Sequence, residues 1–173
     1  MINPALPRVC IPPGGYHISQ QPVCLVTLLG SCVAACMRDP LTKIAGMNHF
    51  LLPKGGRALP VGIRTRYGEW ALPMLMDEMI QRGAHPNRIE VALFGGGNMM
   101  PGVLRCEVGE KNAEFAQKFV RESGLKLIHA DLGGLHPRRI SFDTQTGLFH
   151  VHRVEPHTQS PLINIAAAKP TRP

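Results

Sequence analysis

The pattern of apolar and polar positions predicts a chain that is rich in short β-strands. Apolar and β-branched segments that are separated by Gly, Pro, Asn or Asp are typical of strands. Such segments occupy residues 23–29, 33–38, 43–52, 89–94, 125–131, 138–142 and 148–154. Residues 1–22 are rich in Pro and Gly and predict an irregular lead-in, while residues 54–66 predict a loop.

Two segments have helical spacing instead. Between residues 67 and 82 the apolar side chains recur on one face, and Gly83 is a suitable helix stop. Proline is tolerated near the first turn of a helix, so Pro73 places the expected start at about Trp70. A second amphipathic pattern covers residues 111–123.

Two helices among these strands predict an α+β protein with a sheet core and helices packed on its faces. The close spacing of consecutive strands favours antiparallel pairing. A length of 173 residues suits one domain. We expect that domain to span residues 1–155, followed by a flexible C-terminal tail at residues 156–173.

Composition excludes some classes of function. The formal net charge of +7 favours acidic partners in general. Aromatic residues make up only 5% of the chain, which does not suit a surface that stacks on bases. We therefore expect no nucleic-acid partner.

The chain also lacks the signals of a membrane or exported protein. Its longest apolar stretch covers residues 23–37 and is interrupted by polar residues, whereas a membrane span needs roughly 20 apolar residues. The N-terminal sequence lacks the order of a signal peptide. The five cysteines are an odd number and are expected to stay free thiols in the cytoplasm.

Cys32 and His49 are the strongest candidates for chemistry. If residues 39–42 form a four-residue hairpin loop, Arg38 faces Lys43 and, counting outward, Cys32 faces His49. Directly opposed residues have Cβ atoms about 4.5–5.5 Å apart. A charged imidazole lowers the pKa of a neighbouring thiol and can later protonate a leaving amine.

Other interpretations of these residues stay open at this point. Buried free cysteines are ordinary core residues, which is also how we interpret Cys36. Cys32, Cys36 and His49 do not make a usual set of four zinc ligands, so we expect no metal and no cofactor. The segment 94–98 contains three consecutive glycines without a phosphate-binding motif, which favours a tight turn near the active site. Histidines crowd the last third of the chain, at His129, His136, His150, His152 and His157. A metal or proton site at His150 and His152 is the alternative to the default of surface or partly buried side chains.

Taken in order, several short motifs resemble those of the chemoreceptor glutamine deamidases of the CheD family. The resemblance covers about residues 10–154. The motifs are Leu29-Gly30-Ser31-Cys32-Val33, Asp39-Pro40, Gly46-Met47-Asn48-His49-Phe50-Leu51-Leu52-Pro53, Phe94-Gly95-Gly96-Gly97-Asn98-Met99, Gly109-Glu110-Lys111-Asn112, Asp131-Leu132-Gly133-Gly134, Arg138-Arg139-Ile140-Ser141-Phe142 and Thr146-Gly147.

The resemblance implies a layered α/β/β/α sandwich with mostly antiparallel sheets, similar to bacterial deamidating toxins. It places the nucleophile on Cys32 and the catalytic histidine on His49, with Thr27 as the third site residue. The implied reaction converts glutamine to glutamate and ammonia through a thioester. The implied partners are the cytoplasmic domains of methyl-accepting chemotaxis receptors and, for some relatives, a chemotaxis phosphatase of the CheC type.

Two other functions remain to be tested against this one. The same Cys–His pair would serve another cysteine hydrolase or a transglutaminase. Alternatively, the chain is a non-catalytic adaptor that binds a chemotaxis phosphatase or a receptor, with Cys32 kept for packing.

Overall fold

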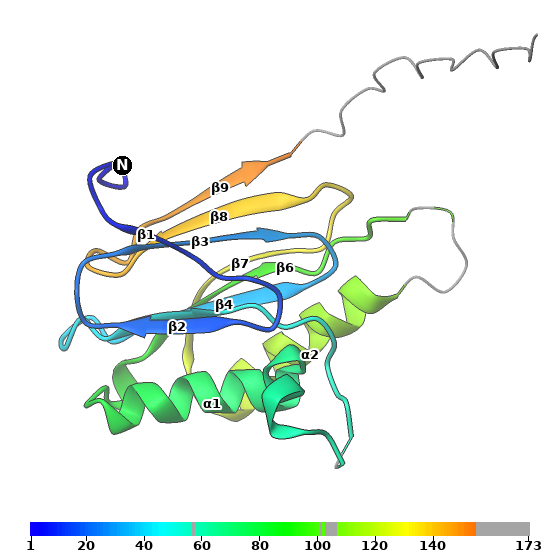
Figure 1. Cartoon of the computed structure of the whole chain (residues 1–173), viewed down its shortest axis with the longest axis horizontal. Helices are drawn as coiled ribbons and strands as arrows, with labels where there is room; N and C mark the ends of the chain where they lie inside the picture. Colours follow the sequence, from blue (N-terminus) through cyan, green and yellow to red (C-terminus); the bar gives the residue numbers. More distant parts are fainter. Residues whose placement is uncertain (57, 101, 103–106, 155–173) are drawn as a thin grey trace, which may run out of the picture.

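The computed structural model describes residues 1–56, 58–100, 102 and 107–154. In this part of the chain two β-sheets are stacked and helices lie on one side of the stack (Figure 1). The four-stranded sheet has the order β1 (Arg8–Cys10), β3 (Cys24–Leu29), β8 (Arg138–Asp143) and β9 (Phe149–Arg153). The five-stranded sheet has the order β2 (Tyr16–Ser19), β5 (Ala45–Asn48), β4 (Val33–Arg38), β6 (Glu90–Gly95) and β7 (Lys126–Leu132).

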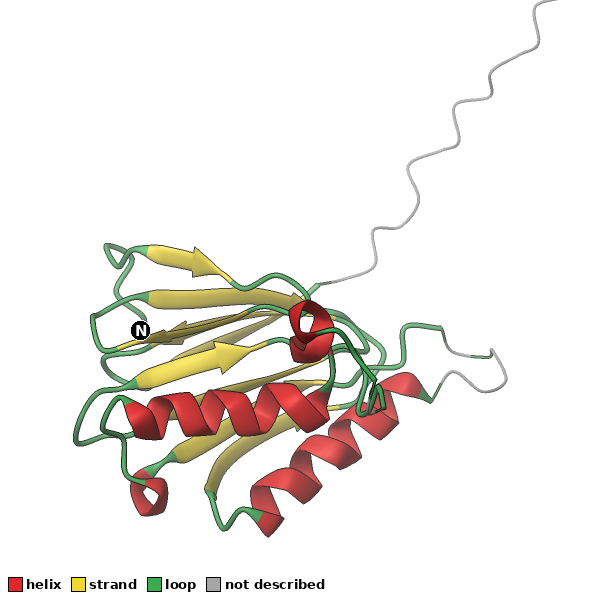
Figure 2. Cartoon of the chain, turned by 60° about the horizontal axis from the view of Figure 1, so that its bottom comes forward, coloured by secondary structure: helices red, strands yellow, loops and turns green. Residues whose placement is uncertain are grey.

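Both long helices cover the outer face of the five-stranded sheet. Figure 2 shows α1 (Gly68–Gln81) and α2 (Val108–Glu122) in front of these strands. Two 3₁₀ helices, η1 (Val61–Arg66) and η2 (Pro86–Arg88), flank α1. None of the helices in the described ranges is long and apolar enough to cross a membrane.

Strand β4 lies at the centre of the molecule and is buried along its whole length. Its side chains alternate between two apolar layers, as the pleat of a strand requires. Val33, Ala35 and Met37 face the helices. Ala34 and Cys36 face the four-stranded sheet, so Cys36 is a core residue of the layer between the sheets. Burial on both faces explains why residues 33–37 form a continuous apolar run.

The predicted fold class is confirmed. The two sheets are mostly antiparallel, and the parallel exceptions among the described strands are β1 beside β3 and β6 beside β7. Within the described residues the layers follow the order helices, five-stranded sheet, four-stranded sheet, so the second helical layer of the implied α/β/β/α sandwich is not found there. The predicted tail at residues 156–173 lies outside the described residues.

Several local predictions were wrong. The lead-in contains strands β1 and β2, and the predicted loop at 54–66 contains η1. Helix α1 begins at Gly68 and keeps Pro73 inside it. The earlier start has a physical cause, because the amides of Gly68 and Glu69 donate to the carbonyls of Leu52 (2.8 Å) and Pro53 (3.0 Å). These bonds satisfy N–H groups that a helix cannot pair internally.

The turn that follows β4 is held by a buried carboxylate. Asp39 is fully buried and accepts hydrogen bonds from the backbone of Leu41 (3.0 Å) and His85 (2.9 Å). The Arg88 guanidinium lies 2.7 Å from its Oδ2 atom. The hydrogen bonds from Arg88 hold the pKa of Asp39 well below its usual range, although burial opposes this shift.

We predict that Asp39→Asn lowers the free energy of unfolding at pH 7 by about 2 kcal/mol, because the buried carboxylate loses charge-assisted hydrogen bonds. A depressed carboxyl pKa contributes stability that is present above the pKa of the unfolded chain, about 3.9, and is lost as the pH falls below it. Urea denaturation from pH 7 to pH 2 measures both effects.

The matched control is Asp77→Asn, because Asp77 is an exposed residue of α1. Its effect is expected to stay within about 0.5 kcal/mol at every pH. Equal loss of stability in the two variants, or an Asp39→Asn protein that keeps the wild-type acid sensitivity, would contradict the assigned role of Asp39.

Candidate active site

The turn between β4 and β5 sets where the candidate residues meet, and it is longer than predicted. The backbone N–H of Asp39 donates to the carbonyl of Ile44 (2.9 Å), and Lys43 adopts a left-handed conformation with φ 62°. Arg38 consequently pairs with Ala45 instead of Lys43. The predicted four-residue loop is therefore wrong, and the register is shifted by two residues.

The shift changes how Cys32 and His49 are related. Val33 pairs with Phe50, with backbone bonds of 3.1 and 3.0 Å, so Ala34 lies opposite His49. Direct opposition of Cys32 and His49 was therefore a wrong prediction. Because the shift is an even number of residues, both side chains stay on the same face. They are diagonal neighbours, a relation with a typical spacing of about 7–8 Å that longer side chains can bridge.

His49 is held firmly by its backbone and by its ring. Its N–H donates to the carbonyl of Gly15 (3.0 Å) and its carbonyl accepts from Gly14 (2.7 Å). The residue is 2% exposed, and its Nδ1 atom lies 2.8 Å from Oγ1 of Thr27. Thr27 belongs to β3 of the other sheet, so this hydrogen bond crosses from one sheet to the other.

The hydroxyl of Thr27 determines which ring nitrogen carries the proton. It donates its single hydrogen to the carbonyl of Ile11 at 2.8 Å, because a carbonyl can only accept. Toward His49 the same oxygen must therefore accept, which requires a proton on Nδ1. The neutral imidazole then keeps a free lone pair on Nε2, which is the form that a general base needs.

Cys32 lies in the short connection that crosses from β3 to β4. It is partly exposed and packs against the apolar layer between the sheets. The amide of Gly97 donates to the carbonyl of Gly30 (2.9 Å), and the amide of Gly96 donates to the carbonyl of Cys32 (2.8 Å). Gly96 and Gly97 therefore hold the backbone of the loop that carries Cys32.

Gly95 shows why this support needs glycine. Its φ is +110°, a backbone conformation that other residues rarely adopt, and a Cβ atom there would overlap the carbonyl oxygen of Cys32. The interpretation of residues 94–98 as a tight turn near the candidate site is confirmed.

The electrostatics favour uncharged side chains. Burial raises the pKa of the Cys32 thiol, and a bond from its own amide only partly opposes the shift. Burial lowers the pKa of His49, while the Ile11 carbonyl acts in the opposite direction. The structure therefore favours a neutral thiol beside a neutral imidazole. The expected lowering of the thiol pKa does not hold in this state, because burial penalises both charged forms.

This arrangement suits proton transfer that accompanies attack. No hydrogen bond joins Cys32 to His49 in the described structure, and such bonds often tighten only when substrate is bound. A substrate carbonyl that reaches the partly exposed thiol would meet a nucleophile next to a base of fixed tautomer.

Sequence reasoning did not single out Asn112. This fully buried residue of α2 donates to the carbonyls of Ser31 and Leu51, on either side of the candidate pair. Its place in the motif Gly109-Glu110-Lys111-Asn112 was the available signal.

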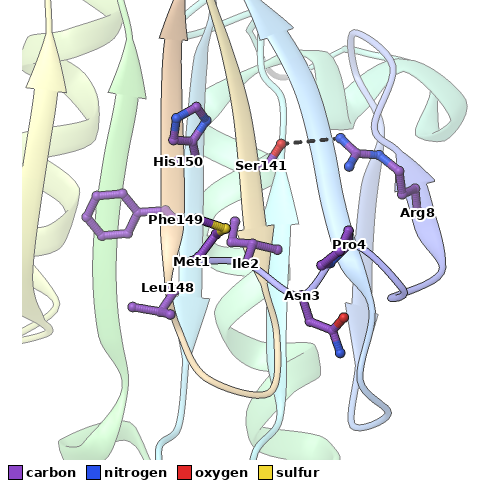
Figure 3. A pocket seen from close by; sticks show the side chains of 9 residues that line it. All are labelled: Met1, Ile2, Asn3, Pro4, Arg8, Ser141, Leu148, Phe149 and His150. Atoms are coloured by element: carbon purple, nitrogen blue, oxygen red, sulfur yellow. Dashed lines mark hydrogen bonds between the residues drawn. The ribbon is translucent and has the colours of Figure 1, made fainter.

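A cavity of about 340 Å³ lies away from these residues. Figure 3 shows that it opens beside β8 and β9, where Arg8 donates to Ser141. None of Thr27, Cys32 and His49 lines it. Among the histidines of the last third, His129 packs against Phe94 and Phe149, whose ring centroids lie 5.6 and 4.6 Å from its own.

Comparison with known proteins places the chain among chemotaxis proteins. The family described as "CheD chemotactic sensory transduction" matches residues 51–153. The chain is 46% identical over 145 residues to a protein of Xanthomonas euvesicatoria pv. vesicatoria (strain 85-10), which covers 84% of this chain and 72% of the relative. It has the same identity and coverage with a protein of Stenotrophomonas maltophilia (strain K279a).

A relative in Methylobacillus flagellatus is 38% identical over 155 residues, which is 88% of this chain and 76% of that protein. All three relatives are named as a probable chemoreceptor glutamine deamidase CheD. The family match begins after His49. The relatives extend further, because 145 aligned residues in a chain of 173 must include Cys32 and His49.

We predict that neutral His49 carries its proton on Nδ1, and that Thr27→Val removes this preference. Valine has nearly the shape of threonine but cannot accept the Nδ1–H bond. Long-range ¹H–¹⁵N NMR of the histidine ring distinguishes the two tautomers directly. Thr27→Ser is the matched control, because it keeps the hydroxyl and is expected to keep the wild-type pattern. A wild-type ring protonated on Nε2 would contradict the assignment.

Proposed function

The chain belongs to the CheD family, and we propose that it hydrolyses the side-chain amide of glutamine residues on chemotaxis receptors. The observation that carries this proposal is the His49 ring, fixed by Thr27 with a free Nε2 lone pair, beside the partly exposed thiol of Cys32. The names of the relatives supply the substrate class. Because the substrate is the cytoplasmic domain of a receptor, we place the reaction in the cytoplasm.

In the first half-reaction Cys32 Sγ attacks the carboxamide carbon while His49 Nε2 takes the thiol proton. The carbonyl π electrons move to oxygen. The imidazolium then protonates the amide nitrogen, the C–N bond breaks, and ammonia leaves a thioester behind. Throughout these steps Thr27 accepts the Nδ1–H bond and keeps Nε2 directed at the reaction.

In the second half-reaction water attacks the thioester carbon and His49 takes a proton from it. The C–S bond breaks, the sulfur regains its proton from the imidazolium, and glutamate is released. The sum is glutamine plus water giving glutamate plus ammonia. The enzyme returns to the neutral thiol and neutral imidazole that burial favours.

The backbone of the nucleophile loop offers donors for the oxyanion. In a trans peptide the N–H points away from the preceding C=O. The carbonyl of Gly30 is bound by Gly97 and that of Ser31 by Asn112, so the N–H groups of Ser31 and Cys32 point away from those partners. We assign these two amides to the developing oxyanion, a role that is typically worth 10²–10³-fold in kcat.

The deciding experiment is mass spectrometry of a receptor cytoplasmic fragment that has been incubated with wild-type protein or with Cys32→Ala. We expect a mass increase of about 1 Da at specific glutamines and ammonia release with wild type only. Conversion by Cys32→Ala would remove Cys32 as the nucleophile. A cleaved fragment or an incorporated amine would identify a peptidase or a transglutaminase, and no change with either protein would favour the adaptor.

The pH dependence of kcat/KM tests whether burial moves the two pKa values apart. The neutral pair is active when His49 is unprotonated and Cys32 protonated. Since burial lowers the His49 pKa and raises the Cys32 pKa, we expect a plateau that extends from below about pH 6.5 to above about pH 8.5. A narrow optimum inside this range would contradict it.

From the family resemblance alone, we also propose a chemotaxis phosphatase of the CheC type as a partner. Titration calorimetry with the purified phosphatase from the same organism is the measurement. Absence of binding at roughly 100 μM, a concentration at which specific complexes are normally saturated, would remove this partner.

A further inference from the structure

We propose that Asn112 is a positioning residue that ties the loop of Cys32 to the segment of His49. The inference deepens the proposed function and rests on it for the meaning of the two segments. It starts from the geometry of one buried side chain, and part of its test requires no receptor.

The geometry places a single amide nitrogen between the two segments. Asn112 Nδ2 lies 2.9 Å from the carbonyl oxygen of Ser31 and 2.8 Å from that of Leu51. Ser31 directly precedes Cys32, and Leu51 follows His49 by two residues. The side chain of Asn112 is fully buried.

The two hydrogen bonds from Asn112 lie just beyond the point where the backbone pairing between these segments ends. Val33 and Phe50 form the last backbone pair between them. Beyond it the amides of Leu51 and Leu52 turn away and donate to the carbonyl of Arg66, at 2.8 and 3.2 Å. The two segments diverge beyond this pair. The Asn112 amide lies between them and joins them by hydrogen bonds where the backbone pairing has ended.

An amide is the group that this position requires. Its NH₂ group carries two hydrogens, so one nitrogen can satisfy two carbonyls. The orientation is settled, because a flipped amide would place its oxygen against both carbonyl oxygens. In the settled orientation Oδ1 is buried and has no partner among the described residues. Leaving this buried acceptor unpaired costs free energy. The favourable contribution of Asn112 at this position therefore comes from the two bonds that it donates.

The bond to Ser31 acts on the reacting groups through the peptide that joins Ser31 to Cys32. Fixing that carbonyl fixes the plane of the peptide, and with it the direction of the Cys32 N–H that we assign to the oxyanion. The bond to Leu51 holds the chain that leads back to His49. Asn112 touches neither substrate nor reacting atoms, so its contribution is to the distance and orientation between them.

The test compares Asn112→Leu, which removes both donors at similar volume, with Asn112→Ser, which can hold one carbonyl. On the receptor fragment we expect Asn112→Leu to lower kcat on the order of 10²-fold, the usual cost of misplaced reacting groups, with KM within about twofold. Asn112→Ser is expected to give a smaller loss. If the leucine variant fails to fold, the serine variant carries the test.

A second readout uses the chain alone. Alkylation of Cys32 by iodoacetamide is followed on its own peptide by mass spectrometry, which separates it from the other cysteines. Release of the loop exposes the thiol, so we expect roughly threefold or faster alkylation in Asn112→Leu at a fixed pH. This measurement does not depend on whether the receptor is the substrate.

The matched control is Val120→Ala in the same helix. Val120 is buried in the layer that faces the helices and has no bond to either segment. It is expected to lower the urea midpoint while kcat and the alkylation rate stay near wild type. Equal changes in Val120→Ala and Asn112→Leu at equal stability would overturn the positioning role. An altered alkylation rate in Asn112→Leu alone, with wild-type protein inactive on receptor, would support Asn112 and reject the proposed substrate.

Discussion

The hydrogen bond between Thr27 and His49 is the constraint on which the arrangement of the site depends. It joins two sheets that otherwise meet mainly through apolar side chains. Stacked sheets lie about 10 Å apart, a distance set by the volume of the side chains between them. Polar ties elsewhere fix the same spacing, because Arg138 of one sheet binds Asp131 of the other (2.6 Å) and Arg38 binds the carbonyl of Thr144 (3.1 Å). The core packing therefore determines the geometry of the proposed base.

The same burial that orders the site also keeps it uncharged. A dry environment strengthens the Thr27–His49 bond but penalises both a thiolate and an imidazolium. Burial is the largest influence on the Cys32 pKa, and the bond from its own amide opposes it only in part. The pair is therefore neutral at rest, and in the proposed reaction charge develops only when substrate arrives. Stabilising that charge then falls to fixed backbone dipoles, which act without reorganisation.

Much of the fold could be predicted because buried positions are occupied by apolar residues, which the sequence shows directly. Strand β4 has the predicted bounds of residues 33–38, since it is covered on both faces. Strands β1 and β2 were missed because they are only 3 and 4 residues long and have Pro and Gly around them. The turn after β4 was too long to predict, because the left-handed Lys43 and the many bonds to Asp39 depend on contacts with distant residues.

Only part of the candidate site could be predicted from the sequence, for related reasons. Thr27 was proposed through resemblance and not through spacing, because its bond to His49 joins different sheets. Asn112 lies 81 positions from Ser31 in the sequence, and no local pattern connects them. The wrong register still kept Cys32 and His49 on one face, since an error of two residues preserves the alternation of side chains.

The corrected, diagonal relation also suits the chemistry better. In the proposed mechanism His49 takes a proton from sulfur and delivers one to the departing nitrogen. The carboxamide then has to lie between the two side chains, and a diagonal pair leaves more room for it than a directly opposed one.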